Sequence, residues 1–479
     1  MADMTPEAWR DKLLGELSTR TAEISQLEAY YNGNHPLPAP PDKTTDEYKR
    51  LADLSQTNFC ALVVDAVSER LALRGIRLRP TDAADGQPVD DLDVWVRSWQ
   101  ANNLDAESQM VHDKALGVGR SFVMVWPVDV VEGEEIKLAA MAQITPEDPT
   151  EVIVAYKPGS RRSRVAALKV YRDDWAKRRY ATLFLTDKVY RWEQEVSERA
   201  LSSEQDTRKW KPWNGEDGLG HEVDNPLKIV PIVEFPCRPD MRGGVTPELS
   251  PGVIKVQNRI NKTGFDQVVL GEFQAFPQRY SIGITVEEDE NGTPINPLKP
   301  GPQRVWTLES DDPNSAKIGQ LDAADMSGHL ARIQADITFL AAMTKTPIYY
   351  LQAGMVNVSA DAIRAAEAGL IKKVRKHQLV FGEAWEEVVR LALLAVNDPR
   401  AADVAMEIDW ENPEARSLAE LVDAATKKQS VGVPWRQNME DLGYSPQEID
   451  RMDAERAADS LLSMPTMPTM PATVGAGGA

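Results

Sequence analysis

Apolar residues recur every three or four positions in several long stretches of the chain, which predicts helices there. The first stretch contains Trp9 and ends near Tyr31, where Gly33 can take a left-handed cap and Pro36 prevents continuation. Further helices are predicted over "NFCALVVDAVSERLAL" and "DVWVRSWQANNLDAESQMVHDKALGVGR". The longest one runs from about Ala360 to Asn397 and would span more than about 50 Å at ~1.5 Å per residue.

Between about Ile136 and Pro236 the pattern changes to short apolar runs separated by turn-forming residues. Five strands are predicted there, at "EVIVAYK", "RVAALKVYRD", "YATLFLTD", "KVYRWEQEV" and "KIVPIVEF". Outside this region, strands are predicted at "LRGIRLRP", "SFVMVWPV" and "DVAMEIDWENP". Helices combined with a largely antiparallel sheet predict an α+β fold.

Two predicted helices flank a small β-rich segment. The first, from about Pro251 to Phe273, has a thin apolar stripe made of Val253, Val256, Ile260 and Val268. Because such a helix buries only a narrow face, we expect other chains beside it. The segment from Phe276 to Leu321 has Asn291-Gly292 as a hairpin turn. The second helix is spaced for packing against one partner helix, through Met326, Leu330, Ile333, Ile337 and Leu340.

Residues 413–462 predict a set of short helices, with Gly432 and Pro434 ending the first of them. The tail, residues 463–479, repeats Met-Pro-Thr and ends in glycine and alanine, so we expect it to be disordered.

Composition narrows the class of partners. The chain has 479 residues, which suggests about three structural units, and 54 basic against 74 acidic residues give a net charge of −20. An excess of carboxylates weakens non-specific binding to phosphates, so any contact with nucleic acid should be loose. No run approaches the ~18 apolar residues of a membrane span, and Cys60 and Cys237 are isolated in apolar surroundings. We therefore expect buried free thiols, a reducing cytoplasm and no membrane anchor.

No catalytic, cofactor or metal motif stands out. The five histidines are scattered outside any HExxH or Cys/His cluster, and "GVGRS" precedes a strand, the wrong order for a phosphate-binding loop. The acidic runs "EEDEN" and "DWEN" fit a solvated hairpin tip and a strand end, although Asp409 and Glu411 of the second could hold divalent cations in a nuclease. We therefore expect no cofactor and no metal.

Basic residues concentrate in "KKVRKH", from Lys372 to His377. On a helix Lys372 and Lys376 share one face, and Lys373 and His377 share another. This cluster fits a solvated face or ion pairs to neighbouring subunits, and it also fits a weak electrostatic contact with nucleic acid.

Five segments occur in an order that resembles the portal proteins of tailed double-stranded-DNA bacteriophages. They are "YYNGNHPLP", "ALGVGRSFVMVWP", "IVPIVEFPCRPD", "SPGVIKVQNRINKTGFD" and "DLGYSPQEIDRM", and the resemblance covers about residues 5 to 455. It implies a homo-dodecameric ring at one capsid vertex, a conduit for packaging and ejecting DNA, without catalysis of its own. It also implies as partners the terminase large subunit, the major capsid and scaffolding proteins, a head-completion or adaptor protein, and double-stranded DNA. The protein would lie in the virion, and in the host cytoplasm during assembly.

The resemblance also implies a division of the chain. The parts are a wing (1–246, with 359–412 adding the long helix and a strand), stem helices (247–273 and 322–344), a clip (274–321), a tunnel loop (345–358), a crown (413–462) and the tail (463–479). Candidate DNA contacts in the tunnel loop and the long helix are Lys345, Gln352, Asn357, Lys372, Lys373 and Lys376.

Two alternatives remain at this point. One is a metal-dependent DNA-processing enzyme that uses Asp409 and Glu411, and the other is a different structural head or adaptor protein. The segment "YYNGNHPLP" is expected to be a helix stop at which the tyrosines pack against the sheet and His35 is a surface or hydrogen-bonded residue.

Overall fold

The computed structural model describes residues 4–36, 46–78, 91–127, 142–195, 209–215, 220–275, 279–282, 317–320, 326–352, 359–402, 405–414, 418–444 and 446–462. The predictions for Asn291-Gly292, for "EEDEN" and for the tail lie outside these residues.

The chain combines helices and antiparallel strands, which confirms the predicted α+β class. The α-helices are α1 Pro6–Tyr31, α2 Asp46–Leu54, α3 Phe59–Ser68, α4 Asp91–Val94, α5 Leu104–Val118, α6 Pro251–Ala275, α7 Ser327–Thr344, α8 Ile348–Leu351, α9 Ala360–Ala395, α10 Leu418–Ser430, α11 Trp435–Leu442 and α12 Pro446–Leu462. The strands are β1 Leu73–Arg77, β2 Arg120–Trp126, β3 Gln143–Glu147, β4 Val152–Tyr156, β5 Arg164–Asp173, β6 Arg178–Leu185, β7 Lys188–Glu195, β8 Lys211–Pro212, β9 Glu222–Asp224, β10 Ile232–Pro236, β11 Arg279–Ile282, β12 Lys317–Gln320 and β13 Glu407–Trp410.

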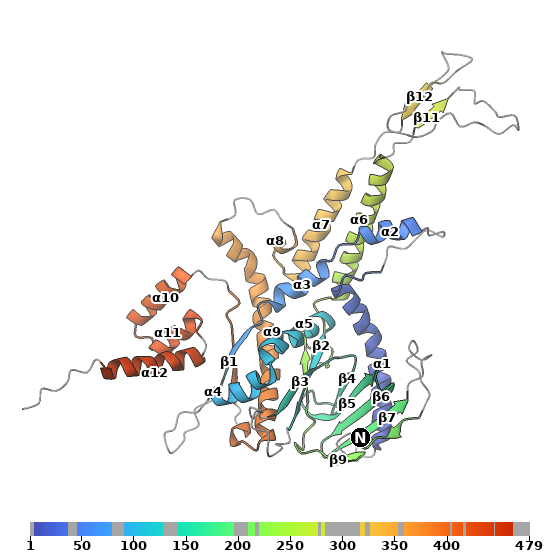
Figure 1. The fold of residues 1–479 in the computed structure, drawn as a ribbon. Helices are drawn as coiled ribbons and strands as arrows, with labels where there is room; N and C mark the ends of the chain where they lie inside the picture. The colour runs from blue at the N-terminus through green and yellow to red at the C-terminus, as the bar shows by residue number, and fades with distance from the viewer. Residues whose placement is uncertain are drawn as a thin grey trace, which may run out of the picture.

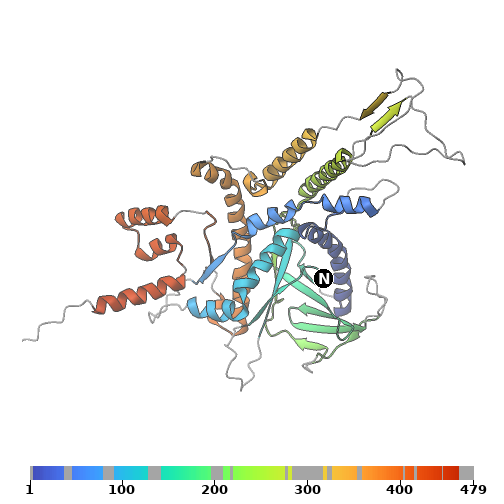
Figure 2. The same ribbon diagram turned by 45° about the horizontal axis from the view of Figure 1, so that its top comes forward.

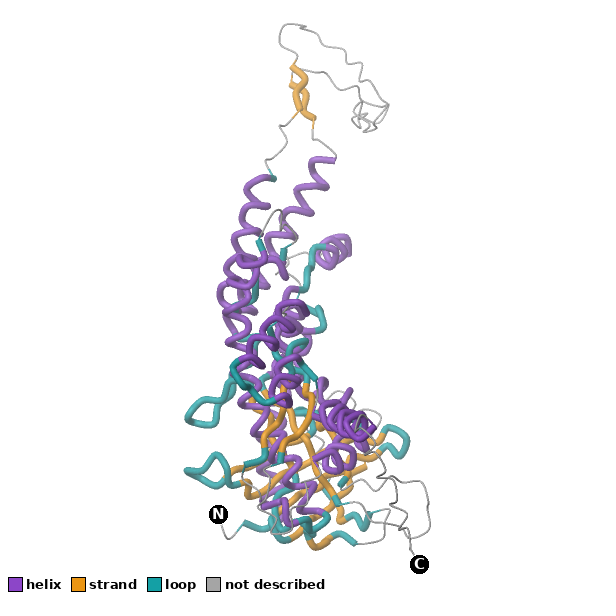
Figure 3. Tube along the Cα trace, turned by 90° about the vertical axis from the view of Figure 1, so that its left-hand side faces the viewer, coloured by secondary structure: helices purple, strands orange, loops and turns teal. Residues whose placement is uncertain are grey.

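The molecule has a mixed body from which a helical hairpin projects. Helices α6 and α7 run side by side away from the body and lead to the β11–β12 pair at the far end (Figures 1 and 2). A side view shows how elongated this arrangement is (Figure 3). Helix α9 passes through the body, and α10, α11 and α12 form a separate group on its other side (Figure 1).

The strands form two main sheets, and all five strands predicted between Ile136 and Pro236 are present. One sheet has the order β10-β2-β3, and the other has the order β4-β5-β6-β7-β8, with β9 also paired to β7. Helix α1 covers the second sheet, where Trp9, Leu13 and Leu17 join a buried cluster with the sheet residues Leu168 and Leu183. A short pair, β1 with β13, joins the N-terminal part of the chain to the segment that follows α9.

The main core is built around α9. Trp385 is fully buried, its ring centroid lies 4.7 Å from those of Trp99 and Phe235, and its Nε1 donates a hydrogen bond to His112 Nε2 at 2.9 Å. Burial lowers the pKa of His112 to about 3, so the neutral imidazole can act as the acceptor. The periodic apolar face of α9 is therefore buried against α5, β2 and β10, as its spacing predicts.

The pattern predicted one helix from Asp93 to Gly119. The structure instead divides this region into several separate elements. Residues Trp95–Trp99 are wound as a π-helix, and Asn103 has a left-handed backbone, with φ of 56°, before α5 begins at Leu104. Asparagine tolerates this conformation better than most residues. The change of direction lets Trp99 and Leu104 both reach the core, where each is almost completely buried.

The thin apolar stripe of α6 is supplemented by buried amides, which the sequence analysis missed. Gln257 and Asn261 are buried, and both bind the backbone at the start of α3. Gln257 Oε1 accepts from the Phe59 amide at 3.0 Å, its Nε2 donates to the Thr57 carbonyl at 2.6 Å, and Asn261 Oδ1 accepts from the Thr57 amide at 3.3 Å. This face of α6 therefore contacts its own chain through polar as well as apolar groups.

The end of α1 and the segment after it form a packing corner, in which the tyrosine hydroxyls bind other helices. The Tyr30 hydroxyl donates to Asn258 of α6 at 2.9 Å, and the Tyr31 hydroxyl donates to Asp65 of α3 at 2.9 Å. His35 is buried, with its Nδ1 2.9 Å from the Asn261 amide nitrogen and its Nε2 3.1 Å from the Tyr30 carbonyl. The prediction of a hydrogen-bonded histidine is confirmed, and Tyr30 is buried in the core cluster that also holds Val123 and Val125 of β2.

Two smaller predictions can be checked as well. The thiols of Cys60 and Cys237 are free and buried, as expected. Helix α7 packs beside α6, and Ile337 and Leu340 of its predicted stripe are buried, but Leu330 of the same stripe is 48% exposed. Among the described residues, no helix combines the length and the apolar character that a bilayer crossing requires.

Candidate functional site

The candidate site is the junction where the projecting hairpin meets α9. Helix α7 ends because Lys345 takes a left-handed backbone, with φ of 56°, and Pro347 then precedes the short helix α8. The hydroxyls of Thr344 and Thr346 are buried and lie 2.9 Å apart, and the Thr346 amide donates to the Ala341 carbonyl at 3.1 Å. The chain thus leaves the hairpin through a closed, hydrogen-bonded turn.

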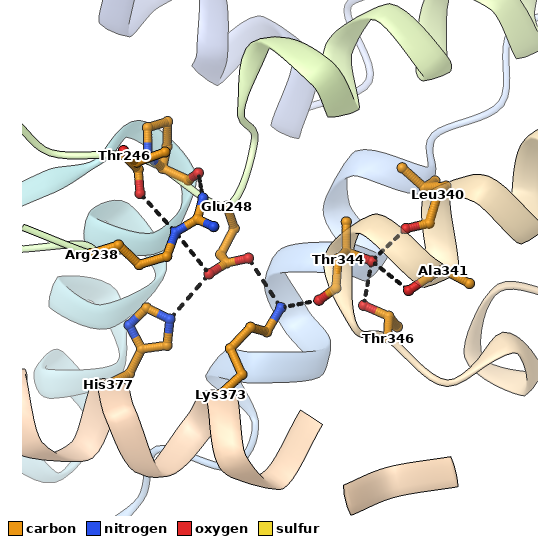
Figure 4. Close-up of polar contacts among 10 residues, drawn as sticks. Arg238, Thr246, Glu248, Leu340, Ala341, Thr344, Thr346, Lys373 and His377 are labelled. Atoms are coloured by element: carbon orange, nitrogen blue, oxygen red, sulfur yellow. Dashed lines mark hydrogen bonds and ion pairs between the residues drawn. The ribbon is translucent and has the colours of Figure 1, made fainter. Parts of the chain in front are cut away.

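Lys373 of α9 binds this turn directly. Its Nζ donates to the Thr344 carbonyl at 2.6 Å and to Glu248 Oε2 at 3.0 Å (Figure 4). The side chain of Lys373 is only 9% exposed, and that of Glu248 only 2%. One ammonium group therefore connects α9, the end of α7 and the loop that precedes α6.

Glu248 receives two further donors. His377 Nε2, one turn along α9, lies 3.1 Å from Glu248 Oε1, and Arg238 Nε lies 3.6 Å from the same oxygen. Arg238 has a positive φ of 42°, which is unusual for a residue other than glycine, and its Nε also donates to the Thr246 carbonyl at 3.1 Å. We call Arg238, Glu248, Lys373 and His377 the junction cluster (Figure 4).

The junction cluster holds one anion, Glu248, between two cations, Lys373 and Arg238. Burial alone would raise the pKa of Glu248, but the hydrogen bond from His377 and the charges of Lys373 and Arg238 outweigh it and lower that pKa from 4.5 to about 2. Burial lowers the pKa of Lys373, and the attraction of Glu248 opposes this shift only in part. Glu248 is therefore an anion at neutral pH, which provides an acceptor for each of its three neighbours.

The fold brings together three side chains of types that can bind a metal ion, those of Cys237, Glu248 and His377. One ligand atom each of Cys237, Glu248 and His377 lie within 4.8 Å of one another, a proximity that sequence spacing does not reveal. Burial raises the pKa of the Cys237 thiol to about 12, so the thiol stays protonated. The Glu248 carboxylate is already bound by Lys373 and Arg238. The arrangement therefore fits an ion-pair network better than a metal centre.

A second polar group holds α8 in place. Arg70 Nη2 donates to the Tyr350 hydroxyl at 2.7 Å and lies 3.1 Å from Glu367 of α9, and the Tyr349 hydroxyl donates to the same carboxylate at 2.5 Å. Helix α8 is thereby bound to the turn that follows α3 and to α9 at once. The sequence analysis did not single out these residues, because their partners are distant in sequence.

The predicted DNA contacts lie in different environments. Lys345, Lys372 and Lys376 are exposed, Gln352 is half-buried, and Asn357 lies outside the described residues. Lys373 is the exception, because its ammonium group is buried in the junction cluster. Its inclusion as a DNA contact needs correction: in this fold its charge is used within the chain.

The two carboxylates assigned to the alternative DNA-processing enzyme, those of Asp409 and Glu411, lie in different environments. Asp409 of β13 forms ion pairs with Arg74 at 3.1 Å and with Arg77 at 3.4 Å, and its side chain is only 12% exposed. Glu411 is exposed at the end of the strand. The Asp409 carboxylate therefore serves the pairing of β1 with β13.

A family model described as "Phage portal protein, SPP1 Gp6-like" matches residues 10–460. The chain belongs to this portal protein family. It is 29% identical to the portal proteins of Mycobacterium phages L5 and D29, with 98% of the chain and 93% of each relative covered. It also resembles a chain from the neck of a native gene transfer agent particle, computed with C12 symmetry. That match has 12% identity and a TM-score of 0.43, and it covers 88% of this chain and 99% of the other.

Membership of the portal family decides the class of the protein. Portal proteins are structural components of the phage virion, and the family is not one of enzymes. The resemblance seen in the five sequence segments is therefore confirmed over nearly the whole chain.

Acid should weaken the junction cluster of this portal protein. A carboxyl group whose pKa falls on folding contributes stability above its unfolded pKa, and that contribution is lost as the pH falls through the folded pKa. For Glu248 the window runs from pH 4.5 down to about 2, and the loss amounts to roughly 3 kcal/mol. The measurement is the denaturation midpoint of wild type and Glu248→Gln at a series of pH values from neutral to acid.

The wild type should be the more stable protein at neutral pH, and its advantage should shrink on acidification. Comparison of the two proteins cancels the other carboxylates, which titrate in both. An advantage that is independent of pH would contradict the ionised state assigned to Glu248.

Proposed function

We propose that the chain forms a homo-dodecameric ring at a single capsid vertex, through which DNA is packaged and later ejected. The observation that carries this proposal is the set of exposed apolar side chains on α7, namely Leu330 at 48%, Phe339 at 58% and Met343 at 53%. At 100° per residue, Leu330 lies in line with the buried stripe of α7, beyond its fully buried part, whereas Phe339 and Met343 lie to one side of that stripe. A neighbouring copy on that side would cover Phe339 and Met343, as the head-to-tail contacts of a closed ring would do.

The proposed division of labour follows the shape of the chain. The α6–α7 hairpin would form the stem, residues 274–321 the clip that docks the terminase and later a head-completion protein, and residues 413–462 the crown. The body, with α9, would form the wing that meets capsid and scaffolding proteins. Support comes from the separation of these parts around α9 (Figure 1).

The proposed contacts with DNA are few. They comprise Lys345, Gln352 and Asn357 in the tunnel loop, residues 345–358, together with Lys372 and Lys376. Support comes from the exposure of the three lysines, for which no carboxylate lies within ion-pair distance in the described part of the chain. On a protein with a net charge of −20, so few cationic contacts would let phosphates pass without holding them.

Electron microscopy in negative stain, with light scattering for the mass, tests the ring. We expect annular particles with a central channel wide enough for duplex DNA, and a mass that is a multiple of one chain. A monodisperse monomer under every salt condition would contradict assembly by the chain alone. Rings without a terminase-binding end would favour a different structural head or adaptor protein, so binding of purified terminase to the particles is the second measurement.

A further inference from the structure

The body carries a group of basic residues around a hollow of about 1020 Å³, formed by the loop after β4 and the loop after β10. Four exposed cations line it, namely Lys157, Arg161, Arg162 and Arg242. We call these four residues and the space between them the basic hollow. In a chain with 74 acidic and 54 basic residues, such a concentration of positive charge is unusual.

The cations of the basic hollow differ from the arginines beside them. Arg120 lies 2.8 Å from Glu234, and Arg164 lies 2.5 Å from Glu387. For the four cations of the basic hollow, no carboxylate within ion-pair distance occurs among the residues that the structure describes. Their charges are therefore available to an external anion.

Both loops are closed by their own hydrogen bonds. The Asp240 carboxylate accepts from the backbone amides of Arg242 at 2.7 Å and Gly244 at 2.8 Å. In the other loop, Ser160 Oγ accepts from the amide of Ser163 at 3.1 Å. Arg161 Nη1 donates to the Asp240 carbonyl at 2.6 Å and so links the two loops. Binding would thus require little ordering of the backbone.

Apolar groups share the lining with the cations. Met241 is 94% exposed at the rim, and Pro236, Pro239 and Val245 also line the hollow. Arginine and methionine are enriched in protein interfaces, and arginine pairs with carboxylates through two parallel hydrogen bonds. A phosphate backbone offers no apolar group to Met241, and a rigid duplex is convex. The lining therefore favours a protein segment over nucleic acid.

We propose that the basic hollow binds an acidic segment of a partner protein, with at least two carboxylates beside an apolar side chain. The carboxylates would pair with Arg161, Arg162 and Arg242, and the apolar side chain would rest on Met241. This surface belongs to the body and is independent of whether the chain forms a ring. It gives the body a partner distinct from the one proposed for the clip.

The test uses the full chain and a short fluorescein-labelled peptide of alternating glutamate and leucine, with fluorescence anisotropy as the readout. We expect saturable binding that weakens at high salt and falls by about tenfold or more in Arg161→Glu/Arg162→Glu. Met241→Ala should weaken it by a smaller factor. The matched control, Lys12→Glu/Lys255→Glu, makes the same change in net charge at exposed positions of α1 and α6 and should bind like wild type.

Each other outcome overturns the proposal. Absence of saturable binding, or equal loss in the control variant, would show that the basic hollow is not a specific site. Displacement of the peptide by duplex DNA, with no effect of Met241→Ala, would assign the surface to nucleic acid. A change in subunit number of Arg161→Glu/Arg162→Glu by light scattering would assign it to a second copy of this chain.

Arg162→Gln, which removes one exposed charge without reversing it, should give an intermediate affinity and provides a second variant if the double one fails to fold.

Discussion

Replacement of Phe339 by glutamate is expected to convert the ring-forming protein into monomers that keep their fold. Phe339 is 58% exposed on α7, so the new carboxylate would be solvated in the monomer. In the proposed ring, burial of a side chain of this size contributes about 1.5 to 3 kcal/mol per contact, and burial of an unpaired charge costs several more. Because the contact recurs at every interface, the ring should not close at concentrations at which the wild type assembles.

Light scattering and electron microscopy measure this loss, and thermal unfolding checks the fold. Ala342→Glu is the matched control, because it places the same charge on the same helix at an exposed position facing away from the buried stripe. It should leave the ring intact. Normal rings in Phe339→Glu would show that this side of α7 is not covered by a neighbour, and loss of rings in both variants would remove the distinction between the faces.

The periodicity of the sequence predicted most of the fold. Helix α9 spans Ala360–Ala395, close to the expected range, because its apolar residues recur on one face that is buried along its length. The strands β4 to β7 were predicted for a related reason, since each run of buried residues ends at turn-forming residues. An element that buries one face carries a regular repeat of apolar residues. This repeat can be recognised in the sequence without knowing which element packs against that face.

The environment of each charged residue could not be read in the same way. The run "KKVRKH" looked uniformly basic, yet Lys373 is buried, while Lys372 and Lys376 are exposed. The difference depends on Glu248, which lies 125 positions away in sequence. One signal was available: Lys373 and His377 each follow an apolar core residue, Leu370 and Val374, by three positions.

The polar side of α6 was misjudged for a similar reason. Gln257 and Asn261 have the composition of a solvated helix, but their amides bind the backbone at the start of α3. A buried amide and an exposed one look the same in a sequence. A buried amide is recognised only when the fold shows which unpaired backbone groups at the start of a neighbouring helix it binds.

Replacement of Lys373 by methionine is expected to lower the free energy of unfolding by about 3 to 5 kcal/mol, the usual cost of removing one partner of a buried ion pair. Methionine keeps much of the length of the lysine chain, so the loss would come chiefly from the charge. Glu248 would keep His377 and Arg238, but the Thr344 carbonyl would lose the ammonium donor at 2.6 Å. The turn between α7 and α8 should therefore open more readily.

Two measurements separate this local effect from a general one. The denaturation midpoint reports the total loss, and hydrogen exchange should show faster exchange for the amides from Thr346 to Gln352. Lys372→Met is the matched control: it removes the same charge from the neighbouring exposed position and should change stability by less than about 0.5 kcal/mol.

The double variant Glu248→Leu/Lys373→Met shows how much of the loss comes from the anion left behind. If the cost of Lys373→Met is mainly an uncompensated buried carboxylate, removing that carboxylate as well should recover part of the stability. Equal stability of Lys373→Met and Lys372→Met would mean that the junction cluster does not hold the end of α7. Recovery in the double variant, with exchange near Thr346 still fast, would separate the two roles of Lys373, because the buried carboxylate would be gone while the donor to the Thr344 carbonyl would still be missing.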